Sequence, residues 1–204
     1  MHHIDLPPIV IVPGLRDHVA DHWQTLLADK LRADGRQVSI VPPLEHNKLD
    51  CAVRVAALER TLASLREPAL LVAHSAGVMI TVHWARRSAR AVRGALLAAP
   101  PDFDHPLPEG YPNEDALRLN GWTPAPRAAL RFPSIVAASR NDPLARFEEV
   151  AALASAWGSR LVDLGNVGHL NPAAGYGEWP RAEPFIQELS EMTELTGQGK
   201  QRTA

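Results

Sequence analysis

The sequence predicts an α/β protein, a three-layer α/β/α sandwich around a mainly parallel sheet of about six strands. Short apolar runs alternate along the chain with longer stretches whose apolar residues recur at helical spacing. The short runs are apolar at every position, which is typical of parallel strands covered on both faces. The length of 204 residues and the hydrophobic fraction of 46% suit one domain with a sizeable core.

Six apolar runs are predicted to form the strands. The first run ends at the breaker Pro13-Gly14, and the second is stopped by Pro42-Pro43. Each crossover between parallel strands is expected to be right-handed. The predicted strands are Ile9–Val12, Val38–Val41, Ala69–Ala73, Gly94–Ala98, Ser134–Ala138 and Leu161–Leu164.

Five stretches of helical period are predicted to cover the sheet, at about 21–34, 53–65, 76–88, 143–157 and 182–192. Eight prolines between residues 100 and 133 predict a long irregular connection rather than a linker between domains. We therefore expect a single domain over residues 1–192. The polar tail, residues 193–204, is expected to be disordered.

The composition excludes several classes of protein. There are 21 basic and 23 acidic residues, so nothing in the charge favours binding to nucleic acid or to an anionic membrane. The lone Cys51 cannot close a disulfide within the chain. No apolar run approaches the roughly 18 residues of a membrane span, and the first residues lack a signal-peptide pattern. The expected localisation is cytoplasmic.

A nucleophile elbow is predicted at Ala73-His74-Ser75-Ala76-Gly77, between the third strand and the helix that follows it. Such a turn needs small residues at its first and last positions, because strand and helix nearly touch there. It forces the central serine into strained backbone geometry and exposes its hydroxyl group. Ala73 replaces the usual first glycine, and a helix N-cap is the alternative role for Ser75.

A serine nucleophile needs a base, and the base needs an acid that fixes its tautomer. His169 is the histidine that follows the last predicted strand, and its alternative is an ordinary loop residue. Asp142 follows the fifth strand and is the expected acid, although it also suits the N-cap of a helix that starts at Pro143. Asp163 is the rival acid, but it lies inside a strand. The order Ser75, Asp142, His169 is that of α/β-hydrolases.

Two backbone N–H groups are expected to bind the negative oxygen of a tetrahedral intermediate. Ala76, directly after the nucleophile, should supply one of them. The other should come from Leu15, in the loop after the first strand. In a parallel sheet these loops share one edge, where ligands bind.

Other motifs give weaker signals. His18 and His22 are spaced like a helical metal pair, but no third ligand is evident, so we expect no metal. His22 and Trp23 are predicted to hold the first loop instead. Cys51 is expected to be a small buried or capping residue rather than a reactive thiol. Gly14 alone is not a phosphate-binding fingerprint, and no organic cofactor is expected.

These motifs resemble the small α/β-hydrolases of the serine hydrolase family that includes retinoblastoma-binding protein 9 and bacterial relatives. The resemblance covers residues 9–186 and implies a compact fold without a large lid, with Ser75 as nucleophile, Asp142 as acid, His169 as base and no cofactor. It rests on Val12-Pro13-Gly14, His22-Trp23-Gln24, Ala73-His74-Ser75-Ala76-Gly77, Ala99-Pro100-Pro101-Asp102, Phe132-Pro133, Ser139-Arg140-Asn141-Asp142-Pro143 and Gly168-His169-Leu170-Asn171.

The substrate pocket is expected near Gly14, Arg16, Leu144 and Trp122. Arg16-Asp17-His18-Val19 stands where the family more often has small residues, and Leu144 stands where an aromatic residue is frequent. Both departures bear on substrate preference. Trp122 either lines the pocket or anchors a surface loop.

The sequence therefore predicts a serine hydrolase that cleaves small esters, or amides and short peptides, through an acyl-enzyme on Ser75. One alternative is a hydrolase-like binding protein with vestigial activity. Another is an acyl transferase or thioesterase that uses the same three side chains. The expected partner is a small-molecule ester or amide substrate, and no protein partner is identified.

Overall fold

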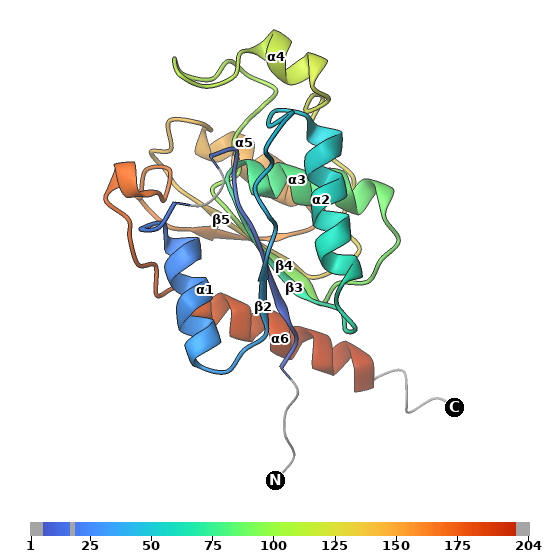
Figure 1. Cartoon of the computed structure of the whole chain (residues 1–204). Helices are drawn as coiled ribbons and strands as arrows, with labels where there is room; N and C mark the ends of the chain where they lie inside the picture. The colour runs from blue at the N-terminus through green and yellow to red at the C-terminus, as the bar shows by residue number, and fades with distance from the viewer. Residues whose placement is uncertain (1–5, 17–18, 199–204) are drawn as a thin grey trace.

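Six parallel strands form one sheet in the order β2-β1-β3-β4-β5-β6 (Figure 1). The structure is a computed structural model and describes residues 6–16 and 19–198. The strands are β1 (Ile9–Val12), β2 (Val38–Ile40), β3 (Leu70–His74), β4 (Gly94–Ala98), β5 (Ser134–Ala138) and β6 (Arg160–Asp163). The α/β class and the parallel six-stranded sheet predicted from the sequence are confirmed.

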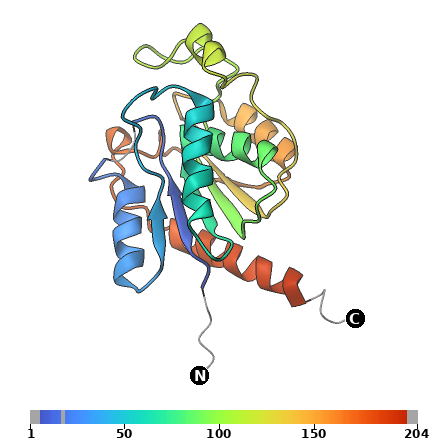
Figure 2. The ribbon, with the colours of Figure 1, turned by 45° about the vertical axis from the view of Figure 1, so that its right-hand side comes forward.

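Helices cover both faces of this sheet (Figures 1 and 2). On one face lie α2 (Cys51–Ala63), α3 (Ala76–Arg87) and α5 (Phe147–Trp157). On the other face lie α1 (Trp23–Ala33) and α6 (Ala182–Gln198). No helix within the described residues is long and apolar enough to cross a bilayer.

The fully buried strands explain the two cores. Along β1, Val10 and Val12 pack into the cluster formed with α2, α3 and α5, whereas Ile9 and Ile11 pack into the cluster formed with α1 and α6. Successive side chains of a strand point to opposite faces, so a strand buried on both faces must be apolar throughout. The burial of the strands on both faces therefore explains both the uninterrupted apolar runs in the sequence and the three layers of the fold.

The sheet order places a topological switch point between β1 and β3. The chain leaves β1 to form β2 on one side, and then returns to form β3 on the other side of β1. Loops that leave the carboxyl ends of these two strands diverge, which opens a crevice where ligands bind in α/β folds. The loop after β1 and the turn after β3 therefore meet at this point.

Two predicted helix boundaries differ from the structure. The fourth predicted helix begins at Phe147 with Arg146 as N-cap, not at Pro143. The backbone N–H of Leu144 donates to Asp142 Oδ1 (2.9 Å), and residues 143–145 form a turn and a bend instead of a first helical turn. The last helix continues to Gln198, into the tail predicted to be disordered, because no proline interrupts it. Residues 199–204 of that predicted tail lie outside the described residues.

A short helix, α4 (Glu114–Leu119), interrupts the proline-rich connection between β4 and β5 and was not predicted (Figure 1). Its N-cap is Asn113, whose side chain accepts a hydrogen bond from the backbone N–H of Ala116 (2.8 Å). Glu114 and Asp115 add negative charge to the first turn, which favours the helix dipole. Asn113-Glu114-Asp115 is the sequence signal for this helix.

Replacing Gly77 by alanine is expected to destabilise the fold by about 3 kcal/mol or more. Gly77 lies in the first turn of α3, where a Cβ would collide with the carbonyl oxygen of Val12 and lie 2.9 Å from that of Pro13. Urea unfolding should show a large fall in the midpoint. Gly177→Ala is the control, since its Cβ would meet its nearest neighbour at 3.7 Å. Equal midpoints for both variants would contradict this packing argument.

Candidate active site

The turn after β3 holds Ser75 in strained backbone geometry. Its φ of 56° and ψ of −130° lie in a region that non-glycine residues rarely adopt. The strand ends at His74 and α3 begins at Ala76, so Ser75 occupies the sharp junction between them. Its backbone N–H donates to the carbonyl of Ala98 on the neighbouring strand (3.0 Å). No side-chain cap hydrogen bond is made by Ser75, so the alternative role as a side-chain N-cap does not fit.

Ser75, His169 and Asp142 form one chain of hydrogen bonds. The Ser75 hydroxyl donates to His169 Nε2 (2.8 Å), and His169 Nδ1–H donates to Asp142 Oδ2 (2.8 Å) and lies 3.0 Å from Oδ1. The side chains of His169 and Asp142 are 7% and 3% exposed. The structure thus brings together three side chains that the sequence separates by many residues. Their catalytic roles remain predictions.

Hydrogen bonds between two loops hold His169 opposite Asp142. The side chain of Asn141 accepts from the backbone N–H of Gly168 (2.7 Å), and Ser139 Oγ accepts from that of Val167 (3.2 Å). Ser139 Oγ also donates to Asn141 Oδ1 (3.0 Å). The loop after β5, which carries the acid, is therefore tied directly to the loop that carries the histidine. The sequence marks these residues only by their place beside Asp142.

His74 supports the loop that carries His169. Its Nε2–H donates to the carbonyl oxygen of His169 (2.9 Å), and its ring is 5.0 Å from the ring of His169. Burial lowers the pKa of His74 well below its usual value, and repulsion from His169 and His22 adds to that effect. His74 is therefore neutral at physiological pH. His74 therefore packs against the ring of His169 and holds the backbone of the loop that carries it.

A cavity of about 470 Å³ opens beside Ser75 and His169. Of the predicted pocket residues, Gly14, Arg16 and Leu144 line it, and so do Leu15 and Ala76, the two predicted oxyanion donors. Its surface is mainly apolar. The apolar residues lining it include Leu15, Val19, Leu49, Phe103, Leu107 and Leu144.

The structure does not place Trp122 among the residues that line this cavity. Its side chain is fully buried, and its indole Nε1–H donates to the carbonyl of Leu49 (2.6 Å). Its ring makes an edge contact with Phe103, which does line the cavity, at 5.4 Å between centroids. Trp122 therefore anchors the β4–β5 connection behind the pocket, which is the alternative role considered from the sequence.

The part of that connection from 101 to 112, called the roof segment, covers the cavity. Phe103, Leu107, Tyr111 and Pro112 all line it. The guanidinium of Arg16 lies over the Tyr111 ring, 5.4 Å from its centroid, and links the roof segment to the loop after β1. These roof residues were not predicted. The sequence signal for them is a set of large apolar side chains within the proline-rich stretch. Such side chains would be exposed if this stretch did not pack against the rest of the protein.

The remaining candidates from the sequence have structural roles. His22 caps α1 by accepting from the backbone N–H of Gln24 (3.2 Å), whereas His18, considered with it as a metal pair and not favoured, lies outside the described residues. Burial raises the pKa of Cys51 to about 12, so its thiol is not an activated nucleophile. Asp163, the rival acid, is paired with Arg140 (2.7 Å) on the surface.

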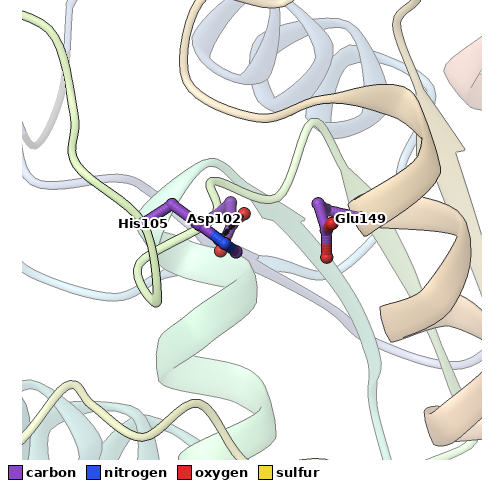
Figure 3. Close-up of side chains that lie close together, drawn as sticks. All are labelled: Asp102, His105 and Glu149. Atoms are coloured by element: carbon purple, nitrogen blue, oxygen red, sulfur yellow. Dashed lines mark hydrogen bonds and ion pairs between the residues drawn. The ribbon is translucent and has the colours of Figure 1, made fainter.

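One group of side chains within the described residues has donor atoms close enough to share a cation. Atoms of Asp102, His105 and Glu149 lie within 4.8 Å of one another, with Glu149 on α5 and the others on the roof segment (Figure 3). His105 Nδ1–H donates to Asp102 Oδ2 (2.6 Å), and Arg146 donates to Glu149 (2.8 Å). Both carboxylates therefore already have protein partners.

The parallel sheet, the serine on a strained turn at the end of β3 and the histidine after the last strand define the class of α/β-hydrolases. The profile of the family described as "Serine hydrolase" matches residues 9–188. The chain belongs to the serine hydrolase family, which confirms the resemblance noted in the sequence. No curated protein matches the chain at a significant level.

Solved structures show the same fold. A YdeN-like hydrolase from Pectobacterium atrosepticum is 29% identical, covers 92% of this chain and 91% of its own, and superposes with a TM-score of 0.72. The ydeN gene product of Bacillus subtilis is 21% identical over 90% of this chain and 98% of its own, with a TM-score of 0.69. Est1E from Butyrivibrio proteoclasticus, solved with ferulic acid bound, is 12% identical over 91% and 87%, with a TM-score of 0.67.

Proposed function

We propose that this protein hydrolyses small carboxylic esters through an acyl-enzyme on Ser75. One observation carries the proposal: Ser75, His169 and Asp142 are linked by two hydrogen bonds of 2.8 Å, and Ser75 and His169 line a cavity at the switch point of the sheet. An unassisted serine hydroxyl is a poor nucleophile at neutral pH. A buried histidine with a fixed tautomer supplies the base that it lacks.

In the proposed reaction, Ser75 Oγ attacks the carbonyl carbon while its proton moves to His169 Nε2. Asp142 stabilises the imidazolium that forms. The backbone N–H groups of Ala76 and Leu15 bind the negative oxygen of the tetrahedral intermediate. That intermediate expels the alcohol, which takes the proton from His169. Water, deprotonated in turn by His169, then releases the carboxylic acid and restores Ser75.

The cavity supports small substrates with an apolar acyl or alcohol part. Its volume of about 470 Å³ lies within the range for small-molecule sites, which is about 300–1,000 Å³. Leu15, Leu49, Phe103, Leu107 and Leu144 present an apolar surface close to the nucleophile. An amide is the second candidate substrate, because the same groups can protonate an amine leaving group.

Two measurements test the proposal together. A fluorophosphonate probe should add to the protein, and peptide mapping should place the adduct on Ser75. A screen of p-nitrophenyl esters of increasing acyl length should show turnover. An adduct elsewhere would remove Ser75 from its role. An adduct on Ser75 without turnover of esters or amides would favour a vestigial binding protein, and acyl transfer to added alcohols or thiols in preference to water would favour a transferase.

We expect esters that carry a carboxylate to be preferred over neutral esters of the same length. Arg16 and Lys48 line the cavity, and none of the described lining residues is Asp or Glu. Both cations are exposed, so the preference should be modest, about fivefold in kcat/KM. Mono-p-nitrophenyl glutarate and p-nitrophenyl valerate, which both have five-carbon acyl chains, make the comparison.

Replacing Lys48 or Arg16 by glutamine should lower the ratio of the two kcat/KM values, as should added salt. Lys30→Gln removes a cation from α1, where it is paired with Glu183, and is the matched control. An unchanged ratio in the Lys48 and Arg16 variants, or the same fall in the control, would show that the preference does not come from these two side chains.

A further inference from the structure

A buried arginine, Arg54 on α2, contacts the loop that carries the proposed second oxyanion donor. Its side chain is among the few charged groups in the interior of the described residues, with 5% exposure. The partners of the guanidinium include the main-chain carbonyls of Lys48 (2.6 Å), Leu15 (3.2 Å) and Gly14 (3.4 Å), to each of which it donates a hydrogen bond. Charged side chains are almost never buried without such partners, so these hydrogen bonds are what allows the guanidinium to lie in the interior.

The bond to Gly14 fixes the direction of the Leu15 N–H. The carbonyl of Gly14 and the N–H of Leu15 belong to the same peptide group, and in a trans peptide they point in opposite directions. Because Arg54 binds the carbonyl, the N–H is directed away from Arg54. Gly14 itself lies against the nucleophile, since a Cβ on it would be 3.2 Å from Ser75 Cβ.

A second buried side chain holds the base of the same loop. Gln24 Nε2 donates to the carbonyls of Val12 (3.2 Å) and Val72 (2.9 Å), which ties the end of β1 to β3. Gln24 therefore fixes where the loop begins, whereas Arg54 acts on the peptide group that carries the donor.

We propose that Arg54 is a positioning residue for the oxyanion hole, which it serves by holding the Gly14–Leu15 peptide so that the Leu15 N–H faces the reacting carbonyl oxygen. The inference rests on the proposed function, because it assumes acyl transfer on Ser75. Arg54 also links the loop that carries Leu15 to the loop that carries Lys48, since its guanidinium binds the carbonyls of both residues. Lys48 and Leu15 both line the cavity.

The test compares Arg54→Met and Arg54→Lys with the wild-type protein on the best ester found. Arg54→Met should lower kcat about 10- to 100-fold with little change in KM, because an oxyanion donor acts mainly in the transition state. Arg54→Lys should recover part of the loss, since one ammonium group cannot reach all three carbonyls. The Ki of a trifluoromethyl ketone analogue of that ester should rise by the factor by which kcat/KM falls.

Arg131→Met is the matched control, because Arg131 also donates to main-chain carbonyls, those of Ala85 and Ser88, at a distance from the cavity. It should leave kcat and Ki unchanged even if the melting temperature falls. Wild-type kcat in Arg54→Met would overturn the inference. If that variant does not fold, wild-type kcat and Ki in Arg54→Lys would overturn it. An inactive wild-type protein that does not react with the phosphonate would instead overturn the proposed function.

Discussion

Replacing Ser75 by alanine is expected to lower kcat about 10⁶-fold, which is the size of the loss when a hydrolase with this triad loses its nucleophile. The proposed acyl-enzyme forms on Ser75, because its hydroxyl donates to His169 Nε2 (2.8 Å). Reaction with the fluorophosphonate should be abolished as well. Both assays should use purified protein with a circular dichroism spectrum that matches the wild type.

The Ser75→Ala variant should remain folded, because the strained φ of 56° belongs to the turn rather than to the hydroxyl group. Ser64→Ala is the control, since Ser64 is an exposed serine that caps the end of α2 through the carbonyl of Thr61. It should keep full activity and full labelling. Labelling that persists in Ser75→Ala would assign the reactive hydroxyl to a different residue.

Replacing Asp142 by asparagine is expected to lower kcat about 10³- to 10⁴-fold, by analogy with the same change in a serine protease. An amide N–H facing His169 Nδ1 would favour the tautomer with its proton on Nε2. That nitrogen then could not accept the proton of Ser75. The side-chain oxygen of asparagine can still accept from the Leu144 N–H (2.9 Å), so the local turn should survive.

Asp163→Asn is the matched control for this change, because Asp163, at the end of β6, is the rival acid considered from the sequence. Its carboxylate binds Arg140 (2.7 Å) and the backbone N–H of Gly165 (2.8 Å). Its substitution should change kcat less than about twofold, as is usual for a surface ion pair. A larger loss in Asp163→Asn than in Asp142→Asn would reverse the assignment of the acid.

The strands and the serine turn could be predicted from the sequence because their signals are local. A parallel strand buried on both faces leaves an uninterrupted apolar run, as in Ile9–Val12. A sharp strand-to-helix turn demands small neighbours, and Gly77 shows why, since any side chain there would meet the end of β1. Each of these constraints acts within a few residues of the chain.

The roles of Arg54 and Asn141 could not be predicted, and the two roles considered for Trp122 could not be separated, since each residue depends on a partner far away in the sequence. Arg54 binds Gly14 and Leu15 across the top of the sheet. Asn141 meets Gly168 only after both loops reach the same edge of the sheet.

The start of α5 was predicted wrongly for a different reason. Asp142 and Pro143 form a favourable helix start, but the Asp142 carboxylate is used by His169, and the helix begins later.

The roof segment has a consequence for how relatives of this protein can diverge. It belongs to a long excursion between β4 and β5, two strands that are hydrogen-bonded neighbours, so both ends of the excursion are anchored. Within the excursion, the Trp122 indole donates to the carbonyl of Leu49, and the Asn120 carbonyl accepts from the Cys51 N–H (3.0 Å). These two bonds attach the excursion to the start of α2 and the loop before it. Insertions or deletions between these anchor points would resize the chamber above the nucleophile without altering the framework, so new substrates could be accommodated by changes in this one excursion.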